Sequence, residues 1–447
     1  MQTHALHLAV VGHTNTGKTS LMRTLLRDSG FGEVKNQAAT TRHVERAAIG
    51  DGLEILVYLY DTPGLEDAGG LLDWLEKHTS GRADGIDRIR EFLDSPEAES
   101  EFNQEAKVLR QLLQSDTALY VVDAREPVLD KYRDELAVLS WCAKPVMPVF
   151  NFTGGQDLSA WTEMLARRTL HVYSGFDTVA FDFEGEIRLW ENLASMLPHR
   201  EMLDRLTAAR RRDWQTVDEQ ARLETAYFLL GVAAFRLETD ADEKRAAEQA
   251  AETMQEAVRQ AEKEFQQRLA RLYRFYQNQI DGGVWAAKTL TKDPFDADLL
   301  KEYGIRTGTG AATGALIGLG IDVLTLGGSL GLGTALGSVL GGVLPNLQSI
   351  SDKLNGKQTL FIDVETIAVL AARARELLHT LQTRGHAAQH NIRTAGHSDI
   401  RPKYEQMLSE ISKARRYPKW SPLNGYDEAF SRSECSETAA ALAEKLK

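Results

Sequence analysis

The sequence predicts an α/β domain followed by a mainly α-helical region. In the first 200 residues, helical patterns separate four apolar runs that predict strands, at Leu6–Val11, Ile55–Tyr60, Ala118–Val122 and Val146–Phe150. Residues 199–278 are rich in Ala, Glu, Arg, Gln and Leu and contain one glycine, which is typical of helices. From 307 to 351 the chain carries one charge, and glycine recurs at a spacing of four, which predicts a glycine-rich apolar hairpin.

The first strand leads into Gly12-x-x-x-x-Gly17-Lys18-Thr19, and a helical pattern follows. Strand, glycine-rich loop and helix together form the P-loop motif, which favours phosphate binding over a turn without a ligand. Backbone N–H groups of such a loop point at phosphate oxygens, while Lys18 reaches the β- and γ-phosphates and Thr19 ligates Mg²⁺. The residues predicted to hold the nucleotide are Gly12, Asn15, Thr16, Gly17, Lys18, Thr19 and Ser20.

A second motif, Asp61-Thr62-Pro63-Gly64, ends the predicted strand at 55–60. After a P-loop, we expect Asp61 to hold Mg²⁺ and Gly64 to contact the γ-phosphate through its backbone N–H. Between the two motifs, a loop threonine, Thr40 or Thr41, can complete the Mg²⁺ shell while triphosphate is bound.

The order GHTNTGKT, TTRH, DTPG and Val121-Val122-Asp123-Ala124-Arg125 resembles the Era/TrmE-like branch of bacterial GTPases over about 200 residues. The resemblance implies a Ras-like fold with a mostly parallel sheet, and GTP hydrolysis with Mg²⁺. It gives Thr41 the switch-I position, so Lys18, Thr41 and Gly64 are the catalytic candidates and Thr19, Thr41 and Asp61 the Mg²⁺ ligands. The layout also resembles a bacterial GTPase family whose helical C-terminal region has no assigned function.

Two positions within this resemblance bear on mechanism. Leu65 follows the DTPG glycine where Ras-like proteins carry the water-orienting glutamine, and leucine cannot orient water. Asn15 matches an asparagine that holds K⁺ in several relatives, which predicts K⁺-stimulated hydrolysis and pairing of two G domains. The alternative is that Asn15 only stabilises its loop. Glu66 is a further candidate for orienting water.

Base recognition departs from the guanine motif Asn-Lys-x-Asp. Asn151 is present at the strand end and is predicted to contact the base, but Phe152 replaces the lysine and can stack on the base instead. The aspartate is absent, since Asp157 lies three residues late, and the motif expected near 174–180 is not legible. GTP is therefore preferred over ATP chiefly on the resemblance.

We predict four domains or regions. Residues 1–198 form the G domain, which includes a long helical insertion at about 66–116 that leaves from the second switch. A helical hairpin at 199–300 is followed by the glycine-rich apolar hairpin at 301–350, in two short segments near 307–321 and 329–344, which either enters a bilayer or packs internally. A helix at about 364–383 and a polar tail make up 351–447.

Two basic groups suggest surface roles. Arg210-Arg211-Arg212 is either a solvated charge run or a contact for lipid headgroups or RNA. The predicted tail groups basic residues with Tyr417 and Trp420, which suits a membrane surface or RNA if the tail is not simply solvated.

The net charge of −12 and the lack of a KH-type GXXG loop disfavour nucleic acid as a partner. Two cysteines and an N-terminus without a basic, cleavable leader predict a cytoplasmic location, or one peripheral to the inner membrane. Three functions stay open. The first is a GTP-hydrolysing switch whose helical half associates with a membrane or a partner protein, and the second is an RNA- or ribosome-assembly GTPase. The third is a nucleotide-dependent scaffold with negligible hydrolysis, or a protein that uses ATP rather than GTP.

Overall fold

The computed structural model describes residues 5–28, 31, 44–198, 200–240, 243–275, 292–296, 299, 320–324, 357–386 and 401–446. The chain divides into two compact units. Unit 1 comprises Met1–Gln215 and Gln382–His390, and unit 2 comprises Thr216–Leu381 and Asn391–Lys447.

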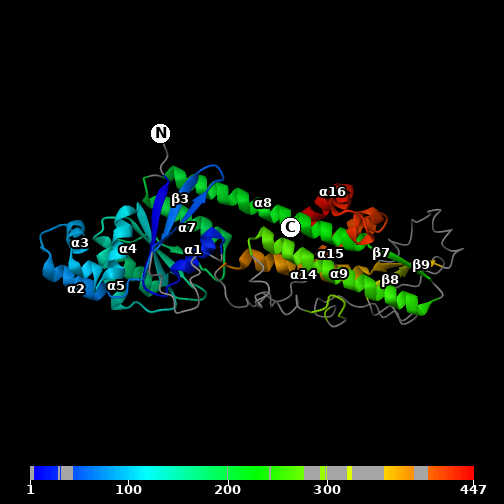
Figure 1. The fold of residues 1–447 in the computed structure, drawn as a ribbon, viewed down its shortest axis with the longest axis horizontal. Helices are drawn as coiled ribbons and strands as arrows, with labels where there is room; N and C mark the ends of the chain where they lie inside the picture. Colours follow the sequence, from blue (N-terminus) through cyan, green and yellow to red (C-terminus); the bar gives the residue numbers. More distant parts are fainter. Residues whose placement is uncertain are drawn as a thin grey trace. The chain divides into compact units, whose positions relative to one another are not determined.

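Unit 1 is built on a six-stranded sheet of order β2-β3-β1-β4-β5-β6 (Figure 1). Only β2 is antiparallel to its neighbour, and the other pairs are parallel. The strands are β1 (Leu6–Val11), β2 (Glu45–Gly50), β3 (Ile55–Asp61), β4 (Thr117–Asp123), β5 (Val146–Asn151) and β6 (Ser174–Gly175). The predicted α/β fold with a mostly parallel sheet is confirmed, and the carboxyl ends of β1, β3, β4 and β5 lie together at one edge.

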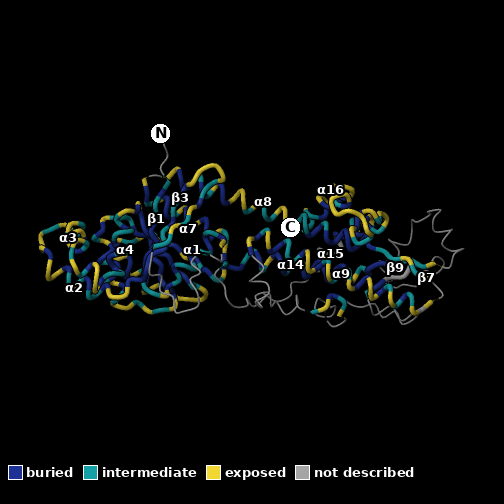
Figure 2. The backbone as a smooth tube through the Cα atoms, viewed as in Figure 1, coloured by how far each residue is buried: buried dark blue, intermediate teal, exposed yellow. Residues whose placement is uncertain are grey.

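Helices cover both faces of this sheet, so its central strands β1, β4 and β5 are buried, whereas the edge strand β2 is largely accessible (Figure 2). Side chains alternate along β4, where Tyr120 and Val122 join one apolar cluster and Leu119 and Val121 join the other. The first cluster includes residues of α2 (Ala68–His78), α4 (Asn103–Gln114), α5 (Asp130–Ser140) and α6 (Ser159–Ala166), and the second includes those of α1 (Lys18–Leu26) and α7 (Phe183–Met196).

The predicted insertion after the second switch has its own helices: α2, α3 (Gly85–Leu93), the 3₁₀ helix η1 (Pro96–Glu99) and α4. Phe92 is fully buried, with its ring centroid 5.4 Å from that of Trp74 and 6.1 Å from that of Phe102. The insertion therefore shares the core of the domain and is not a loose loop.

The arginine triplet lies on α8 (Arg200–Ala234), and two of its members are engaged inside unit 1. Arg210 is 7% exposed, donates to the carbonyl oxygen of Leu25 at 2.6 Å and pairs with buried Glu186 at 3.2 Å. Arg211 pairs with Glu184 and Glu191. The expectation of a solvated or ligand-binding arginine run is therefore wrong at Arg210, because α8 packs against α1 and α7, whereas the Arg211 side chain is 48% exposed and its ion pairs lie at the surface.

Unit 2 combines the second part of α8 with α9 (Lys244–Leu272), α14 (Val364–Thr383) and a small antiparallel sheet of order β7-β9-β8. The rings of Phe228 and Phe265 stack at 4.5 Å and join α8 to α9, while Arg373 of α14 pairs with Glu262 of α9 at 2.6 Å. The helix predicted at 364–383 is confirmed. Strand β7 (Arg236–Asp240), between α8 and α9, was not predicted.

The glycine-rich segment lies mostly outside the described residues. The part that is described contains β8 (Ile321–Leu324), which pairs with β9 (Lys357–Ile362). The helical segment predicted to reach 321 is therefore wrong at its end, since Ile321 and Asp322 belong to a strand. No helix among the described residues combines the length and the apolar character that crossing a bilayer requires.

The predicted polar tail is not simply solvated, because it folds into α15 (Arg401–Ala414), two 3₁₀ helices η3 (Pro418–Trp420) and η4 (Pro422–Asn424), and α16 (Glu428–Lys445). Trp420 is 6% exposed and lies under the ammonium of Lys413. Arg415 donates to the carbonyl oxygen of Ile362 at 2.6 Å. Lys413, Arg415 and Trp420 of the tail thus make contacts inside unit 2.

Candidate nucleotide-binding site

The loop between β1 and α1 has the backbone that curls N–H groups toward one point. Gly12, Asn15 and Gly17 have positive φ angles of 139°, 67° and 94°. A Cβ at Gly12 would lie 2.5 Å from the carbonyl oxygen of Val121, so only glycine fits there. The loop also ends at the N-terminus of α1, where the helix dipole favours an anion.

Lys18 is the buried cation of this loop. It is 7% exposed, and its Nζ donates to the carbonyl oxygens of Gly12 at 3.0 Å and His13 at 2.7 Å. Burial lowers its pKa to about 8, although the charge of Asp61 opposes this. A cation held at the centre of the loop is placed to bind phosphate oxygens.

Asp61, at the end of β3, lies against the first turn of α1. Its Oδ2 accepts a hydrogen bond from Thr19 Oγ1 at 2.6 Å, while its Oδ1 is buried without a hydrogen-bond partner within the described residues. Burial raises the pKa of Asp61 to about 6. A hydroxyl beside a carboxylate that has a spare oxygen fits a Mg²⁺ site, since Mg²⁺ prefers oxygen ligands.

The segment after Asp61 contacts the P-loop directly. A Cβ at Gly64 would lie 2.1 Å from Thr14 Oγ1 and 2.7 Å from the Thr14 nitrogen. The N–H of Leu65 donates to the Gly12 carbonyl at 3.2 Å, and the Leu65 side chain is fully buried in the core. The structure therefore places Gly64 against the loop and removes the Leu65 side chain from it.

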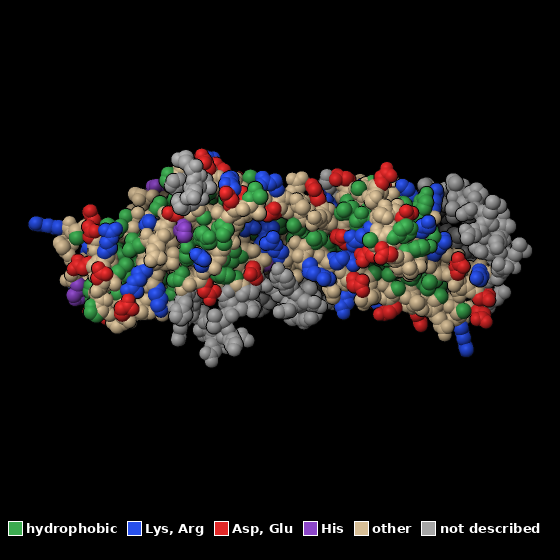
Figure 3. Space-filling view, turned by 45° about the horizontal axis from the view of Figure 1, so that its top comes forward, with side chains coloured by type: hydrophobic (Ala, Val, Ile, Leu, Met, Phe, Trp, Pro, Cys, Tyr) green, Lys and Arg blue, Asp and Glu red, His purple; other side chains and the backbone are tan. Residues whose placement is uncertain are grey.

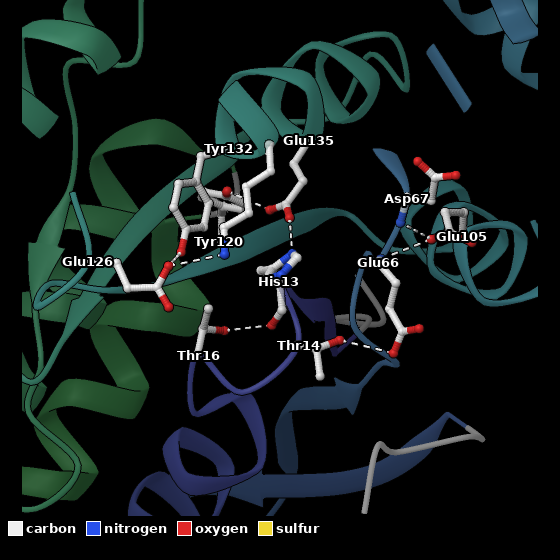
Figure 4. Close-up of polar contacts among 12 residues, drawn as sticks. His13, Thr14, Thr16, Glu66, Asp67, Glu105, Tyr120, Glu126, Tyr132 and Glu135 are labelled. Carbon is white, nitrogen blue, oxygen red and sulfur yellow. Dashed lines mark hydrogen bonds and ion pairs between the residues drawn. The ribbon is translucent and has the colours of Figure 1, made fainter. Parts of the chain in front are cut away.

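Two buried glutamates support this arrangement, and the sequence reasoning missed both (Figure 4). Glu135 of α5 accepts from Tyr120 OH and contacts His13 Nδ1, both at 2.7 Å. Burial, reinforced by the nearby Glu135 carboxylate, raises the pKa of Tyr120 well above its usual value. Glu105 of α4 accepts the N–H groups of Glu66 and Asp67, both at 2.9 Å. Each glutamate lies on the buried, mostly apolar face of its helix. A charged residue at such a position in the sequence is the signal that could have identified it.

Asn151 is fully buried and its amide joins three segments. Its Nδ2 donates to the Thr16 carbonyl at 3.1 Å, and its Oδ1 accepts from the Phe152 N–H and from the backbone and hydroxyl of Thr178. A Cβ at Gly17 would lie 2.3 Å from this Nδ2. The structure thus gives Asn151 a linking position, and its contact with a base stays a prediction.

Phe152 lies beside the P-loop, with its Cζ 3.7 Å from a Cβ built on Gly17, and has a positive φ of 56°. The guanidinium carbon of Arg125 lies 4.0 Å from its ring centroid. Asp123 holds that guanidinium with two hydrogen bonds, of 2.9 and 2.6 Å, which raise the pKa of Arg125. An aromatic face and a fixed planar cation therefore stand where the usual motif has a lysine.

A segment distant in the sequence packs on the loop that carries Thr178. Ala180 forms a bridge with Arg384, and the Gly385 N–H donates to the Val179 carbonyl at 3.0 Å. A Cβ at Gly385 would lie 1.9 Å from the Thr178 oxygen. Asp177 fixes the same loop by accepting the N–H groups of Val179 and Ala180.

The remaining predicted residues are placed as follows. Asn15 is exposed, and its side chain makes no hydrogen bond within the described part of the chain. Ser20 lies in the first turn of α1, and its carbonyl accepts from Thr24. Asp157 is exposed and bonded to Ser159, outside the P-loop contacts. Thr40 and Thr41 lie outside the described residues.

The sheet order and this loop define a P-loop nucleotide-binding domain, and the comparisons with known proteins agree. Residues 7–152 match the model of a family described as 50S ribosome-binding GTPase. Residues 162–444 match the model named Domain of unknown function (DUF3482), and the chain belongs to that family. No curated protein matches the chain.

Solved structures give matches of low overall superposition. The Era GTPase of Aquifex aeolicus bound to GDP·AlF₄⁻ is 19% identical over 38% of this chain and 50% of its own, with a TM-score of 0.27. Era in complex with MgGDPNP and a 16S ribosomal RNA segment is 19% identical over 39% of this chain and 52% of its own, with a TM-score of 0.27. A GTP-binding protein of Sulfolobus solfataricus in complex with GDP is 17% identical over 45% of this chain and 52% of its own, with a TM-score of 0.25. The chain spans about half the length of these proteins.

Proposed function

We propose that this protein is a nucleotide switch that binds GTP with Mg²⁺ and hydrolyses it to GDP and phosphate. The observation that carries the proposal is that the P-loop, Lys18 and the residues next to them form one group of contacts. A positive-φ glycine loop, a buried ammonium, the Thr19–Asp61 pair and Gly64 pressed against Thr14 meet at one edge of the sheet. These are the parts that phosphoryl transfer needs for positioning and for charge stabilisation.

Each residue has a task in this proposal. Lys18 binds the β- and γ-phosphate oxygens and stabilises the charge that develops on the transferred group. Thr19 and Asp61 would hold Mg²⁺, with Thr41 as the predicted third ligand, and the ion would neutralise phosphate charge. Gly64 contacts the γ-phosphate through its N–H, which couples the presence of that phosphate to the segment that follows.

GTP is the proposed nucleotide because residues 7–152 match a GTPase family. The Asn-Lys-x-Asp motif gives only partial support, since of its recognition residues only Asn151 is present. In its place, Phe152 offers a ring for stacking on the base. Competition of GTP and ATP against a fluorescent guanine nucleotide tests this choice, and a preference for ATP would overturn it.

Potassium stimulation through Asn15 is part of the proposal. Supporting it, the Asn15 side chain is exposed and makes no hydrogen bond within the described residues, so its oxygen is available to a cation. The alternative is that asparagine is present because it tolerates the positive φ of 67° better than most residues. Faster phosphate release in KCl than in NaCl supports the cation role, and equal rates contradict it.

The main test is multiple-turnover phosphate release by the purified full chain with Mg²⁺ and GTP. Release that disappears when Mg²⁺ is chelated supports the proposal. A chain that binds GTP but releases no phosphate would instead support the nucleotide-dependent scaffold. Light scattering with and without GTP tests the predicted pairing of G domains.

A ribosomal partner is the second candidate function, supported by the name of the family that matches residues 7–152. Among the described residues, the face drawn in Figure 3 has acidic and basic side chains interspersed, whereas RNA binding favours a continuous basic area. Co-sedimentation with ribosomal subunits in the presence of GTP tests this candidate. Membrane association depends on residues 301–350, which lie mostly outside the described residues, and it stays a prediction, as does the inner-membrane location.

A further inference from the structure

We propose that Glu66 orients the attacking water and accepts its proton, and that Glu105 is the positioning residue that holds Glu66 in place. The inference rests on the proposed hydrolysis of GTP. It assigns the task that glutamine performs elsewhere to a residue one position beyond Leu65.

Several carboxylates surround Lys18. Three of them, Asp61, Glu135 and Glu66, act on its charge. Asp61 is bonded to Thr19, and both oxygens of the fully buried Glu135 are engaged, by His13 and Tyr120. Glu66 alone among these three is exposed, so it can contact a water molecule in the site.

The Glu66 carboxylate already reaches the P-loop. Its Oε1 accepts a hydrogen bond from Thr14 Oγ1 at 3.2 Å, and Thr14 is the residue that Gly64 touches (Figure 4). The carboxylate, the γ-phosphate sensor and the phosphate-binding loop therefore meet at one point. Leu65 cannot compete for this place because its side chain is fully buried in the core.

The backbone of Glu66 is fixed on both sides. Before it, the Leu65 N–H donates to the Gly12 carbonyl at 3.2 Å. Its own N–H and that of Asp67 both donate to Glu105 Oε1 at 2.9 Å, and Asp67 caps α2 by accepting the Gly70 N–H at 2.8 Å. A buried carboxylate oxygen that accepts two N–H groups forms strong, charge-assisted hydrogen bonds. Glu105 is 3% exposed, so these bonds are shielded from water.

The water oxygen forms a bond to the γ-phosphorus, and the bond from that phosphorus to the β–γ bridging oxygen breaks with its electron pair left on GDP. One water proton passes to the Glu66 carboxylate and the other stays on the released phosphate. Glu66 then gives its proton to solvent, so the net products are GDP, hydrogen phosphate and a proton.

The first test compares Glu66→Ala with Glu76→Ala, a control at an exposed position of α2. Single-turnover phosphate release and the Kd for GTP are measured on the full chain. We expect Glu66→Ala to lower the rate at least about 100-fold, as for loss of a general base, with Kd within about threefold of wild type. A Glu66→Ala rate within threefold of wild type overturns the inference.

The second test uses Glu105→Gln and Glu105→Leu. Gln keeps an oxygen that accepts both N–H groups, so its kcat should stay within about threefold of wild type, whereas Leu should lower kcat about 10-fold or more at unchanged Kd for GTP. Retained GTP affinity shows that the Leu variant is folded. If the kcat of Glu105→Leu equals that of wild type, or if Glu105→Gln lowers kcat as much as Glu105→Leu does, Glu105 is not the residue that positions Glu66.

The two proposals fail differently. A wild-type chain that does not bind GTP contradicts the proposed function itself, and one that binds GTP without hydrolysing it contradicts both. A wild-type chain that hydrolyses GTP while Glu66→Ala does so equally well contradicts only the role of Glu66.

Discussion

The two ends of the candidate nucleotide site differ in how far they follow the GTPase pattern. At the phosphate end, Gly12, Gly17, Lys18, Asp61 and Gly64 have the expected residue types and also the contacts that those types require. At the base end, Asn151 is kept, but Phe152, with the Arg125 guanidinium over its ring, stands in place of the familiar lysine, and the aspartate is absent.

The difference follows from what each end has to contact. Phosphates are held by backbone N–H groups in a tightly packed loop, where a Cβ added at Gly12, Gly17 or Gly64 would lie only 2.1–2.5 Å from a neighbouring atom. A base offers a flat apolar face and a polar edge, which several side chains can bind. We therefore expect substitutions at the phosphate end to have larger effects than those at the base end.

Gly17→Ala should have the largest effect because Gly17 belongs to both ends. A Cβ there would lie 2.3 Å from Asn151 Nδ2, on a residue with φ of 94°. We expect the affinity for Mg·GTP to fall more than about 100-fold, or ~3 kcal/mol. Titration of a fluorescent GTP analogue measures this, with Gly81→Ala, a glycine with nothing within 4 Å, as the control. Equal affinity of both variants would break the comparison.

Gly64→Ala should separate binding from turnover. Its Cβ would overlap Thr14, so the segment from 64 to 67 would move away from the P-loop. We expect kcat to fall about 30-fold or more, the scale of losing one transition-state hydrogen-bond donor, while GDP affinity changes less than about threefold. Phosphate release and calorimetry with GDP give the two values. A parallel loss of both would mean that Gly64 supports the loop and does not sense the γ-phosphate.

The pH dependence of the affinity for Mg·GTP should reflect the residues at the phosphate end alone. Binding of Mg·GTP requires Asp61 ionised and Lys18 protonated, and their pKa values are about 6 and about 8. Affinity should therefore fall about 10-fold per pH unit below 6 and again above 8, in a bell-shaped profile. A profile that is flat from pH 5 to 9 would contradict this assignment.

Asp61 also predicts an effect on stability without metal. Because its folded pKa is raised above the unfolded value of 3.8, the folded chain binds more protons between about pH 4 and 6, and stability falls as pH rises through that window. Asp61→Asn, whose amide oxygen can still accept from Thr19, should therefore gain about 2 kcal/mol at pH 7.5 without Mg²⁺. Urea unfolding of both chains measures it, and a destabilised variant would be the contrary result.

Phe152→Ala should have the smallest effect of the set. Loss of one base–aromatic stack is worth about 1–2 kcal/mol, so we expect about a 10-fold weaker affinity for GTP. Phe152→Lys restores the usual residue of the guanine motif and should lose less. If Phe152→Ala binds GTP as wild type does, the ring does not contact the base.

The phosphate end could be predicted from the sequence because its motifs are local. A strand, six loop residues and a helix fix the geometry of Gly12 to Thr19 without reference to the rest of the chain. Glu105 and Glu135 could not be assigned in this way, since their partners are backbone groups and side chains brought close only by tertiary packing. Thr178 was missed for the same reason.

Outside the site, the mostly parallel α/β fold was predicted correctly from the family resemblance, and the helix at 364–383 from periodicity, which depends only on neighbouring residues. Arg210 and the tail were misjudged because charge alone does not reveal burial. Arg210 is buried since it satisfies the Leu25 carbonyl and Glu186, and Trp420 is buried with its ring stacked on that of Tyr417. Side chains that carry both charge and a long apolar stem are the hardest to place from a pattern.

Isothermal titration calorimetry of the full chain with GTP and Mg²⁺ tests the central claim most directly. We expect the wild type to give saturable heat at one site per chain. This heat should be absent with Lys18→Ala and much reduced without Mg²⁺. No heat from the wild type, or equal heat from Lys18→Ala, would contradict the assignment of the loop at Gly12–Thr19 as a nucleotide site.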